Sequence, residues 1–137
     1  MTTDTPLDLS LCLQCRCLAA RRRARELTRL YEARLRPHGL RATQFSVLVA
    51  LAAAGPAPIG ALAGALGMER TTLTRGATLL ERNGWVEAVG AEDGRERHLR
   101  LTPAGRAKLE AAYPAWKAAQ DAAERMPRAA PSPSAKR

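Results

Sequence analysis

The sequence lacks the marks of a membrane protein and of a secreted precursor. None of its apolar runs approaches the roughly 20 residues that a helix needs to cross a bilayer. The first residues, Met1 to Pro6, do not have the basic and then apolar layout of a signal peptide. We therefore expect a protein that has no membrane partner and resides in the cytoplasm.

The motifs of several enzyme classes are also missing. The chain has no glycine-rich phosphate loop, no HExxH zinc motif and no nucleophile elbow. Cys12 and Cys15 have C-x-x-C spacing, which makes a thiol-disulfide oxidoreductase a formal alternative. That reading would need a βαβ context, whereas the sequence indicates mostly helices. We expect a protein that is not an enzyme.

Acidic residues are few compared with basic ones. The 137 residues include 22 Lys and Arg but only 13 Asp and Glu, which gives a formal net charge of +9. Such an excess favours a polyanionic partner over an acidic small molecule, because binding releases counterions. The length suits one domain, and a lone copy would bury only a modest core.

A helix-turn-helix pattern occupies the middle of the chain. Apolar residues at helical spacing predict a short helix from Ile59 to Leu66, and Gly67 allows a tight turn after it. A second helix is predicted from Glu69 or Arg70 to Asn83, before Gly84. Its inner side would consist of Leu73, Ala77 and Leu80.

The outer side and flanks of this second helix carry hydroxyls and guanidinium groups. They come from Arg70, Thr71, Thr72, Thr74, Arg75, Thr78 and Arg82. Hydroxyls can bond base edges or phosphates, and arginine can hold guanine through two hydrogen bonds, so this face suits the major groove of DNA. An ordinary solvated helix face is the alternative, although such faces usually mix Glu with Lys.

A hairpin is predicted directly after this helix. Residues 85–89 and 97–101 are rich in strand formers, and a polar, glycine-bearing loop separates them. Leu99 and Leu101 would share one face of the return strand. We expect Arg95 to enter the minor groove with Asp93 orienting it, while Arg97 adds a further cation. A solubilising surface turn is the alternative.

Several motifs in order give the chain a family resemblance. They are Arg70-Thr71-Thr72-Leu73-Thr74-Arg75, the run from Leu80 to Val86, Asp93-Gly94-Arg95, the run from Leu101 to Gly105 and, upstream, the run from Gly39 to Phe45. Together they resemble the MarR family of bacterial transcriptional regulators over roughly residues 10 to 125. One departure is Glu69, where the family often has an Asp that suits the start of a helix.

The resemblance implies a fold and a function. The fold would be mainly α with a small β-hairpin wing, a winged helix-turn-helix that is dimerised through its N- and C-terminal helices. The function would be that of a homodimeric repressor that binds a palindromic operator in double-stranded DNA and leaves it when a small effector arrives. Thr71, Thr72, Thr74 and Arg75 would lie in the major groove, with Arg95 in the wing.

Apolar stripes at both ends of the chain predict the dimer helices. The first stripe is Leu13, Cys17, Ala20, Ala24, Leu27 and Tyr31, and the second is Ala107, Leu109, Ala112, Tyr113 and Trp116. Pro114 is expected to kink or interrupt the second helix. Two copies could intertwine through such helices about a two-fold axis. Packing within one chain is the alternative.

These patterns divide the chain into segments. Residues 1–9 would form an N-terminal arm, and residues 10–125 the MarR-type domain. Within it, the winged helix-turn-helix would span about 40–103, and the dimerisation helices about 10–36 and 104–125. The tail, 126–137, is basic and rich in proline, so we expect it to be disordered. The arginine cluster of residues 21–25 would be spread around the first helix, mostly solvated or paired with acids, and is not assigned to the operator.

The three cysteines, Cys12, Cys15 and Cys17, are the best clue to an effector. Cysteines of cytosolic proteins stay reduced unless they are sensors, catalysts or metal ligands. If the helix already includes Leu11, Cys12 and Cys15 lie about 60° apart and Cys17 points elsewhere. If it begins later, or a second subunit contributes, a site for a soft metal ion or a trivalent metalloid becomes possible. No cofactor is otherwise indicated.

Cys17 also stands where the organic-hydroperoxide regulators of the same family have their peroxide-sensing cysteine. Tyr31 matches a tyrosine that contacts that thiol in those proteins, whereas Arg21 replaces an aromatic residue one helical turn after it. Thiol oxidation, metal binding and plain packing therefore stay open for the cysteines. The competing function is a cysteine-based metal, metalloid or thiol-redox protein whose winged-helix module binds other proteins.

Overall fold

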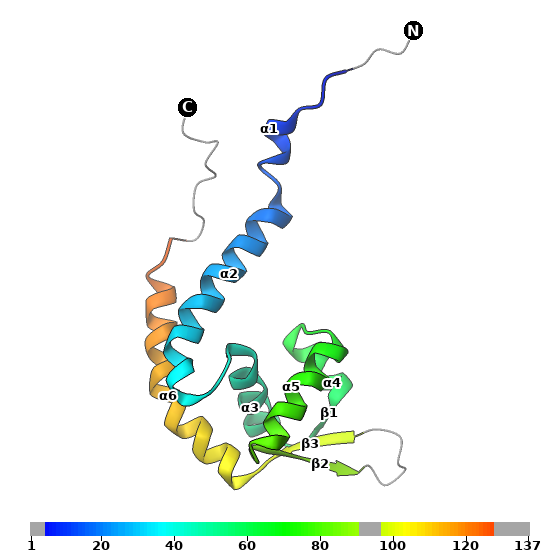
Figure 1. Ribbon diagram of the computed structural model, residues 1–137, viewed down its shortest axis with the longest axis vertical. Coiled ribbons are helices and arrows are strands. Elements are labelled where there is room, and N and C mark those ends of the chain that lie inside the picture. Colours follow the sequence, from blue (N-terminus) through cyan, green and yellow to red (C-terminus); the bar gives the residue numbers. More distant parts are fainter. Residues whose placement is uncertain (1–4, 91–96, 128–137) are drawn as a thin grey trace.

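A computed structural model describes residues 5–90 and 97–127. The first two helices are α1 (Leu9–Cys12) and α2 (Arg16–Leu35), and a short 3-10 helix, η1 (Arg36–His38), follows them. The other helices and strands are α3 (Ala42–Ala54), β1 (Ala57–Pro58), α4 (Ile59–Leu66), α5 (Arg70–Arg82), β2 (Val86–Gly90), β3 (Arg97–Leu101) and α6 (Pro103–Glu124). In Figure 1 the long helices α2 and α6 lie beside each other on one side, and α3 to α5 gather above the small sheet on the other.

The helix-turn-helix prediction is confirmed. The first helix has the predicted bounds, buries Leu62 and Ala63, and ends at Gly67, whose φ of 63° is in the left-handed region. The second helix buries Leu73, Ala77 and Leu80, the three residues predicted for its inner side. The apolar period alone therefore determined which side of α5 packs on the core and which side is left outward.

The hairpin prediction is confirmed with a shift of one residue. β2 begins at Val86 and not at Trp85, and it pairs antiparallel with β3, with Ala88 opposite Leu99. Leu99 is fully buried and Leu101 partly buried, so they share the inner face as predicted. The sequence pattern missed β1, which pairs with β3 in the order β1-β3-β2. A strand of two residues that includes a proline has no periodicity to reveal it.

The junction between the hairpin and α6 is tightly packed. The Thr102 hydroxyl donates to the Gly84 carbonyl at 2.5 Å and accepts from the backbone N–H of Gly105 at 3.0 Å, so one side chain caps α6 and ties it to the end of α5. The backbone N–H of Thr102 donates to the Trp85 carbonyl at 3.1 Å. Lys108 lies over the Trp85 ring, with its Nζ 5.3 Å from the ring centre. These contacts fix the base of the hairpin against α6.

Pro114 changes the direction of α6 without ending it. The helix runs from Pro103 to Glu124 through Pro114, so of the two predicted outcomes, a kink or an interruption, the interruption does not occur. Figure 1 shows instead that its axis bends between the yellow N-terminal part and the orange C-terminal part. A proline inside a helix removes one backbone hydrogen bond and crowds the preceding turn, which accounts for a bend at this position.

The prediction of one long first helix is wrong at its start. Two helices replace it, because residues 13–15 form a turn in which the N–H of Cys15 donates to the Cys12 carbonyl at 3.2 Å. Asp8 caps α1, so α1 starts inside the segment predicted as an arm. Periodicity predicts which face of a helix is apolar, but it does not show where the helix is broken.

The first apolar stripe is covered only in part. Leu27 and Tyr31 are partly buried, whereas Cys17, Ala20 and Ala24 are exposed in the isolated chain. Further along, α6 packs on α2 and stacks Trp116 on Phe45, with ring centres 5.8 Å apart. Contact with a second copy stays a prediction for the exposed part of the stripe.

Some expectations fall outside the described residues. Most of the predicted tail does, since only Met126 and Pro127 of it are described, after the end of α6. The wing tip with Asp93 and Arg95 also lies outside them. Within residues 5–90 and 97–127, no helix is both long and apolar enough to span a bilayer.

Candidate functional site

The outward face of α5 carries the residues predicted to meet DNA. All seven side chains are exposed: Arg70, Thr71, Thr72, Thr74, Arg75, Thr78 and Arg82. The opposite side of the same helix is held in the core by fully buried Leu73 and Leu80. Helix α5 is therefore fixed in the core by one side, and its other side presents a row of hydroxyls and guanidinium groups to solvent.

Two of these threonines already use their hydroxyl protons. Thr74 Oγ1 donates to the Arg70 carbonyl at 2.8 Å, and Thr78 Oγ1 donates to the Thr74 carbonyl at 3.0 Å. Such bonds back to residue i−4 fix the side-chain rotamer and leave the oxygen lone pairs outward. In this arrangement Thr74 and Thr78 can accept a hydrogen bond from a base amino group.

The part of the wing that is described adds one cation to this surface. Arg97 begins β3 and is exposed. Arg100, on the same strand, is instead paired with Glu87 of β2. Asp93 and Arg95 lie outside the described residues, so their predicted contacts stay untested.

The three cysteines lie at the break between α1 and α2. Cys12 ends α1, Cys15 is the N-cap of α2 and Cys17 lies in its first turn, and all three are exposed. Of the two arrangements considered, the one in which Cys12 and Cys15 share a helix does not hold, because α2 begins only at Arg16. Within the part of the chain that the structure describes, no three His, Cys, Asp or Glu side chains are grouped to hold a metal ion. One chain therefore does not form the proposed three-sulfur site.

Cys15 lies at the N-terminus of α2, where backbone N–H groups are free to face its thiol. Its side chain makes no capping hydrogen bond, but Cys15 is the N-cap residue, so its thiol lies at the start of α2. The backbone N–H groups of Leu18 and then Cys17 lower the pKa of the Cys15 thiol, and the charge of Arg21 lowers it further. A lower pKa raises the fraction of nucleophilic thiolate. Sequence reasoning had singled out Cys17, since the cap position became visible only with the helix break.

Tyr31 binds within its own chain. Its hydroxyl donates to Gln120 of α6, and its ring lies 6.4 Å from that of Trp116, centre to centre. Burial, and to a lesser extent the charge of Glu124, raises the pKa of Tyr31, which keeps the phenol protonated as a donor. Cys17 is 14 residues earlier on the same helix, a rise of about 21 Å. The predicted contact between Tyr31 and the Cys17 thiol would therefore need a second copy of the chain.

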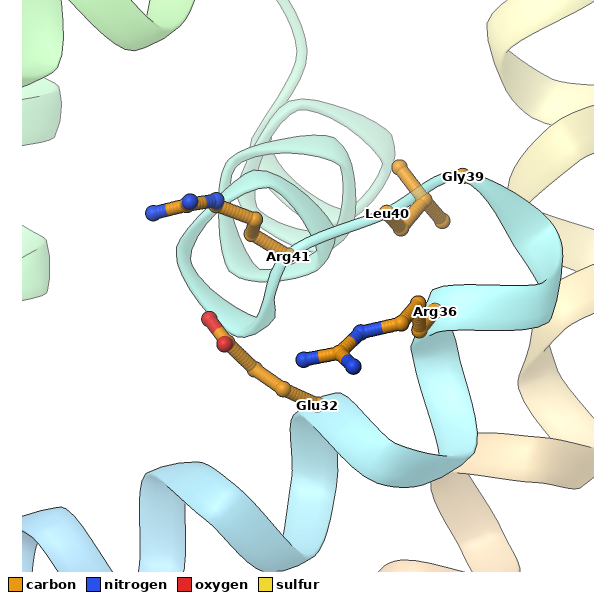
Figure 2. A pocket seen from close by; sticks show the side chains of 5 residues that line it. All are labelled: Glu32, Arg36, Gly39, Leu40 and Arg41. Carbon is orange, nitrogen blue, oxygen red and sulfur yellow. The ribbon is translucent and has the colours of Figure 1, made fainter.

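A small pocket that the sequence did not predict lies where α2 meets α3 (Figure 2). It has a volume of about 170 Å³ and is lined by Glu32, Arg36, Gly39, Leu40 and Arg41. Pockets for drug-sized ligands usually exceed about 300 Å³. Its arginines and its carboxylate come from three different segments, and no local motif would have grouped them.

Comparisons with known proteins agree with this geometry. The model of the MarR family matches residues 40–96. A curated relative, an uncharacterised helix-turn-helix transcriptional regulator YwoH of Bacillus subtilis, is 37% identical over 87 residues. That match covers 64% of this chain and spans 64% of the length of the relative.

Solved structures extend the likeness over most of the chain. The transcriptional regulator MosR of Mycobacterium tuberculosis in complex with DNA has a TM-score of 0.76 and 38% identity, covering 85% of this chain and 86% of that one. Reduced AbfR bound to DNA has a TM-score of 0.71 and 27% identity, covering 80% and 81%. The segment that the family model matches contains α3, α4, α5 and β2, and the likeness to MosR extends over 85% of the chain. The chain belongs to the MarR family of winged-helix transcriptional regulators.

Proposed function

We propose that two copies of the chain bind a palindromic operator in double-stranded DNA and repress transcription. The observation that carries this proposal is the outward face of α5, whose exposed threonines and arginines sit on a helix anchored by buried leucines. MosR and AbfR have been solved bound to DNA, which supports the same use of this face. Each α5 would enter one major groove, with half-sites about 34–36 Å apart. Binding of DNA also places the protein in the cytoplasm.

The second copy would cover the exposed part of the first apolar stripe. Leu9, Leu11 and Leu13 are 55–65% exposed in the isolated chain, and Cys17, Ala20 and Ala24 continue this surface along α2. Such a length of apolar surface is rarely left to solvent. The proposed segments follow from this: residues about 10–36 and 104–125 would dimerise, and residues about 40–103 would bind DNA. In the wing, Asp93 would orient Arg95 in the minor groove.

Replacing Arg75 with alanine is expected to weaken operator binding by about 1–3 kcal/mol, because arginine holds a guanine through two hydrogen bonds. The operator is first selected from a library of random duplexes, and the affinities of both proteins are then measured at one salt concentration. Arg106→Ala is the matched control, since Arg106 is an exposed arginine on α6 that pairs with Glu110. An equal loss on operator and random DNA would contradict base reading by Arg75.

We also propose that oxidation of the cysteines at the start of α2 releases the protein from DNA. The Cys15 thiolate would attack a hydroperoxide, which forms the sulfenic acid of Cys15 and an alcohol. A neighbouring thiol would then displace water and form a disulfide. The turn that joins Cys12 to Cys15 is closed by a 3.2 Å hydrogen bond, so their backbones are already close. AbfR has been solved on DNA in reduced and overoxidised forms, which supports thiol chemistry in this fold. Metal or metalloid binding would need thiols from both copies.

Cys15→Ser is expected to leave the affinity of the reduced protein for DNA unchanged and to abolish release by hydroperoxide. The reason is that serine keeps the size of the side chain but cannot form the thiolate. Release is followed by fluorescence anisotropy, with free thiols counted afterwards. Cys17→Ser and Cys12→Ser are made in parallel, since the sequence alone had pointed to Cys17. Release that is lost only in Cys17→Ser would show that Cys15 is not the sensor, and release by arsenite alone would favour metalloid binding.

A further inference from the structure

Four arginines of α2 form one exposed stripe. They are Arg21, Arg22, Arg25 and Arg29, hereafter the arginine stripe, and all are exposed. At about 100° per residue, these positions fall within an arc of about 100° along the helix. The expectation that the basic cluster is spread around the helix is therefore wrong for three of its members, and Arg29 joins them one turn later. Only Arg23 points elsewhere.

Most of the stripe, Arg22, Arg25 and Arg29, lies away from the apolar side of α2, and Arg21 lies at its edge. Leu27 is about 200° from Arg25, and Tyr31 is about 200° from Arg29, by the same helical geometry. The apolar side faces α6 and continues as the exposed Cys17, Ala20 and Ala24. A second copy that covers those residues would leave Arg22, Arg25 and Arg29 in solvent, whereas Arg21, about 40° from Cys17, would border the covered surface.

Little negative charge balances the stripe. Among the described residues, the one ion pair on α2 joins Arg23 to Glu26 at 3.7 Å, and neither residue belongs to the stripe. Two acids of α2 border the stripe: Glu26, four residues after Arg22, and Glu32, three residues after Arg29, which lines the pocket with Arg36. Four like charges this close raise the energy of the free protein, and a polyanion would relieve that repulsion.

The spacing of the charges resembles that of a nucleic-acid backbone. Arg21 and Arg29 are eight residues apart, a rise of about 12 Å, so the four cations are on average about 4 Å apart along the helix. One DNA strand carries a phosphate every 3.4 Å of helix axis, roughly the same spacing. Guanidinium groups also bind phosphate oxygens in pairs of hydrogen bonds. An anionic membrane fits less well, because a membrane-surface helix buries its apolar face in the bilayer, and the apolar side of α2 is packed on α6 at Tyr31.

The position of the stripe separates it from the operator face. In Figure 1 the N-terminal half of α2 extends away from the layer that holds α5, β2 and β3. One straight duplex in contact with α5 would therefore not reach the stripe. We infer that the arginine stripe is a second nucleic-acid site, which binds the phosphate backbone of another DNA segment without reading its sequence. A dimer with two such stripes could join distant segments of DNA.

The test is a capture experiment with the full chain. The duplex that the protein selects is immobilised and saturated with protein, and a labelled 30-base-pair duplex of random sequence is then added. A variant with Arg21, Arg22, Arg25 and Arg29 changed to Gln is compared with a control in which Arg34, Arg106, Lys117 and Arg125 are changed to Gln. Both variants lose four positive charges per chain, and all eight residues are exposed. A third variant has the four stripe arginines changed to Lys.

Wild type, the control and the Lys variant should capture the labelled duplex, and the Gln stripe variant should still bind the immobilised duplex but capture at least about tenfold less. The slope of log Kd against log salt for capture should fall by up to about 3.6, since each lost phosphate contact contributes about 0.9. Equal capture by the stripe and control variants would overturn the proposal. A Lys variant that does not capture the labelled duplex would also overturn it. So would a stripe that binds anionic vesicles or acidic peptides but no duplex.

The result can be separated from that for the operator. Thr71→Ala with Arg75→Ala should lose sequence selection but still bind random duplexes through the stripe. Suppose that the wild type binds duplexes but selects no sequence, and that the Gln stripe variant no longer binds them. The operator proposal then fails and this one stands. If selection is normal and no second duplex is captured, the reverse holds.

Discussion

Leu73→Ala is expected to lower the free energy of unfolding by about 2–5 kcal/mol, because a large apolar side chain is removed from a closed site and leaves a cavity. Leu73 is fully buried, on the side of α5 that faces the core. Denaturant unfolding followed by circular dichroism measures the loss. The comparison is made at one protein concentration, since association between copies would add to the apparent stability.

Leu79→Ala is the matched control for this change. Leu79 lies on the same helix but is 46% exposed, so its replacement should alter stability by no more than about 0.5 kcal/mol. The two variants remove the same atoms from the same helix and differ in burial alone. Similar losses in both would mean that α5 does not pack through its Leu73 side, and the orientation of the groove face would then be wrong as well.

Gly105→Ala is expected to destabilise the protein by about 3 kcal/mol, at the upper end of what overpacking usually produces. A Cβ at this position would come within 2.0 Å of the Trp85 carbonyl oxygen and 2.8 Å of Leu101 Cδ1. Backbone cannot move aside as a side chain can, so α6 would have to shift away from the hairpin. Thermal unfolding and the near-ultraviolet signal of the tryptophans would both report the change.

Gly64→Ala supplies the opposite expectation. Gly64 is also inside a helix, but a Cβ there would meet nothing within 4 Å. Alanine should therefore raise stability by about 0.5–1 kcal/mol, because glycine is the poorer helix former. A loss at Gly64, or no loss at Gly105, would contradict the packing described for the base of the hairpin.

The sequence was most informative where short-range period and turn residues agree. Ile59 to Leu66, Gly67 and the inner side of α5 are all as predicted, because helical spacing and a left-handed glycine act over a few residues. The hairpin of β2 and β3 was predicted for the same reason, whereas β1, the third strand of the sheet, was not. The exposed face of α5 could be inferred in full, because the residues that are buried determine which residues remain exposed on the other side.

The thiol region was predicted less well. Whether a helix continues past Cys12 depends on capping by Asp8 and on turn bonds that compete with the next helical turn. That competition left Cys15, and not Cys17, at the N-terminus of α2. The reactivity of a thiol depends on nearby backbone N–H groups, and their directions follow from the break rather than from the spacing of the cysteines.

By itself, then, the amino-acid order determined the outward face of α5, the hairpin and the family, because each depends on local period, on turn chemistry or on an ordered set of motifs. Only the tertiary structure decided the close approach of Gly105 to Trp85, the bond from Tyr31 to Gln120 and the small pocket at the start of α3. The first two features join residues that are far apart along the chain, and the pocket forms where three successive segments turn against one another. They result from how helices pack on one another. The distance between two packed backbones cannot be predicted from a short-range sequence pattern.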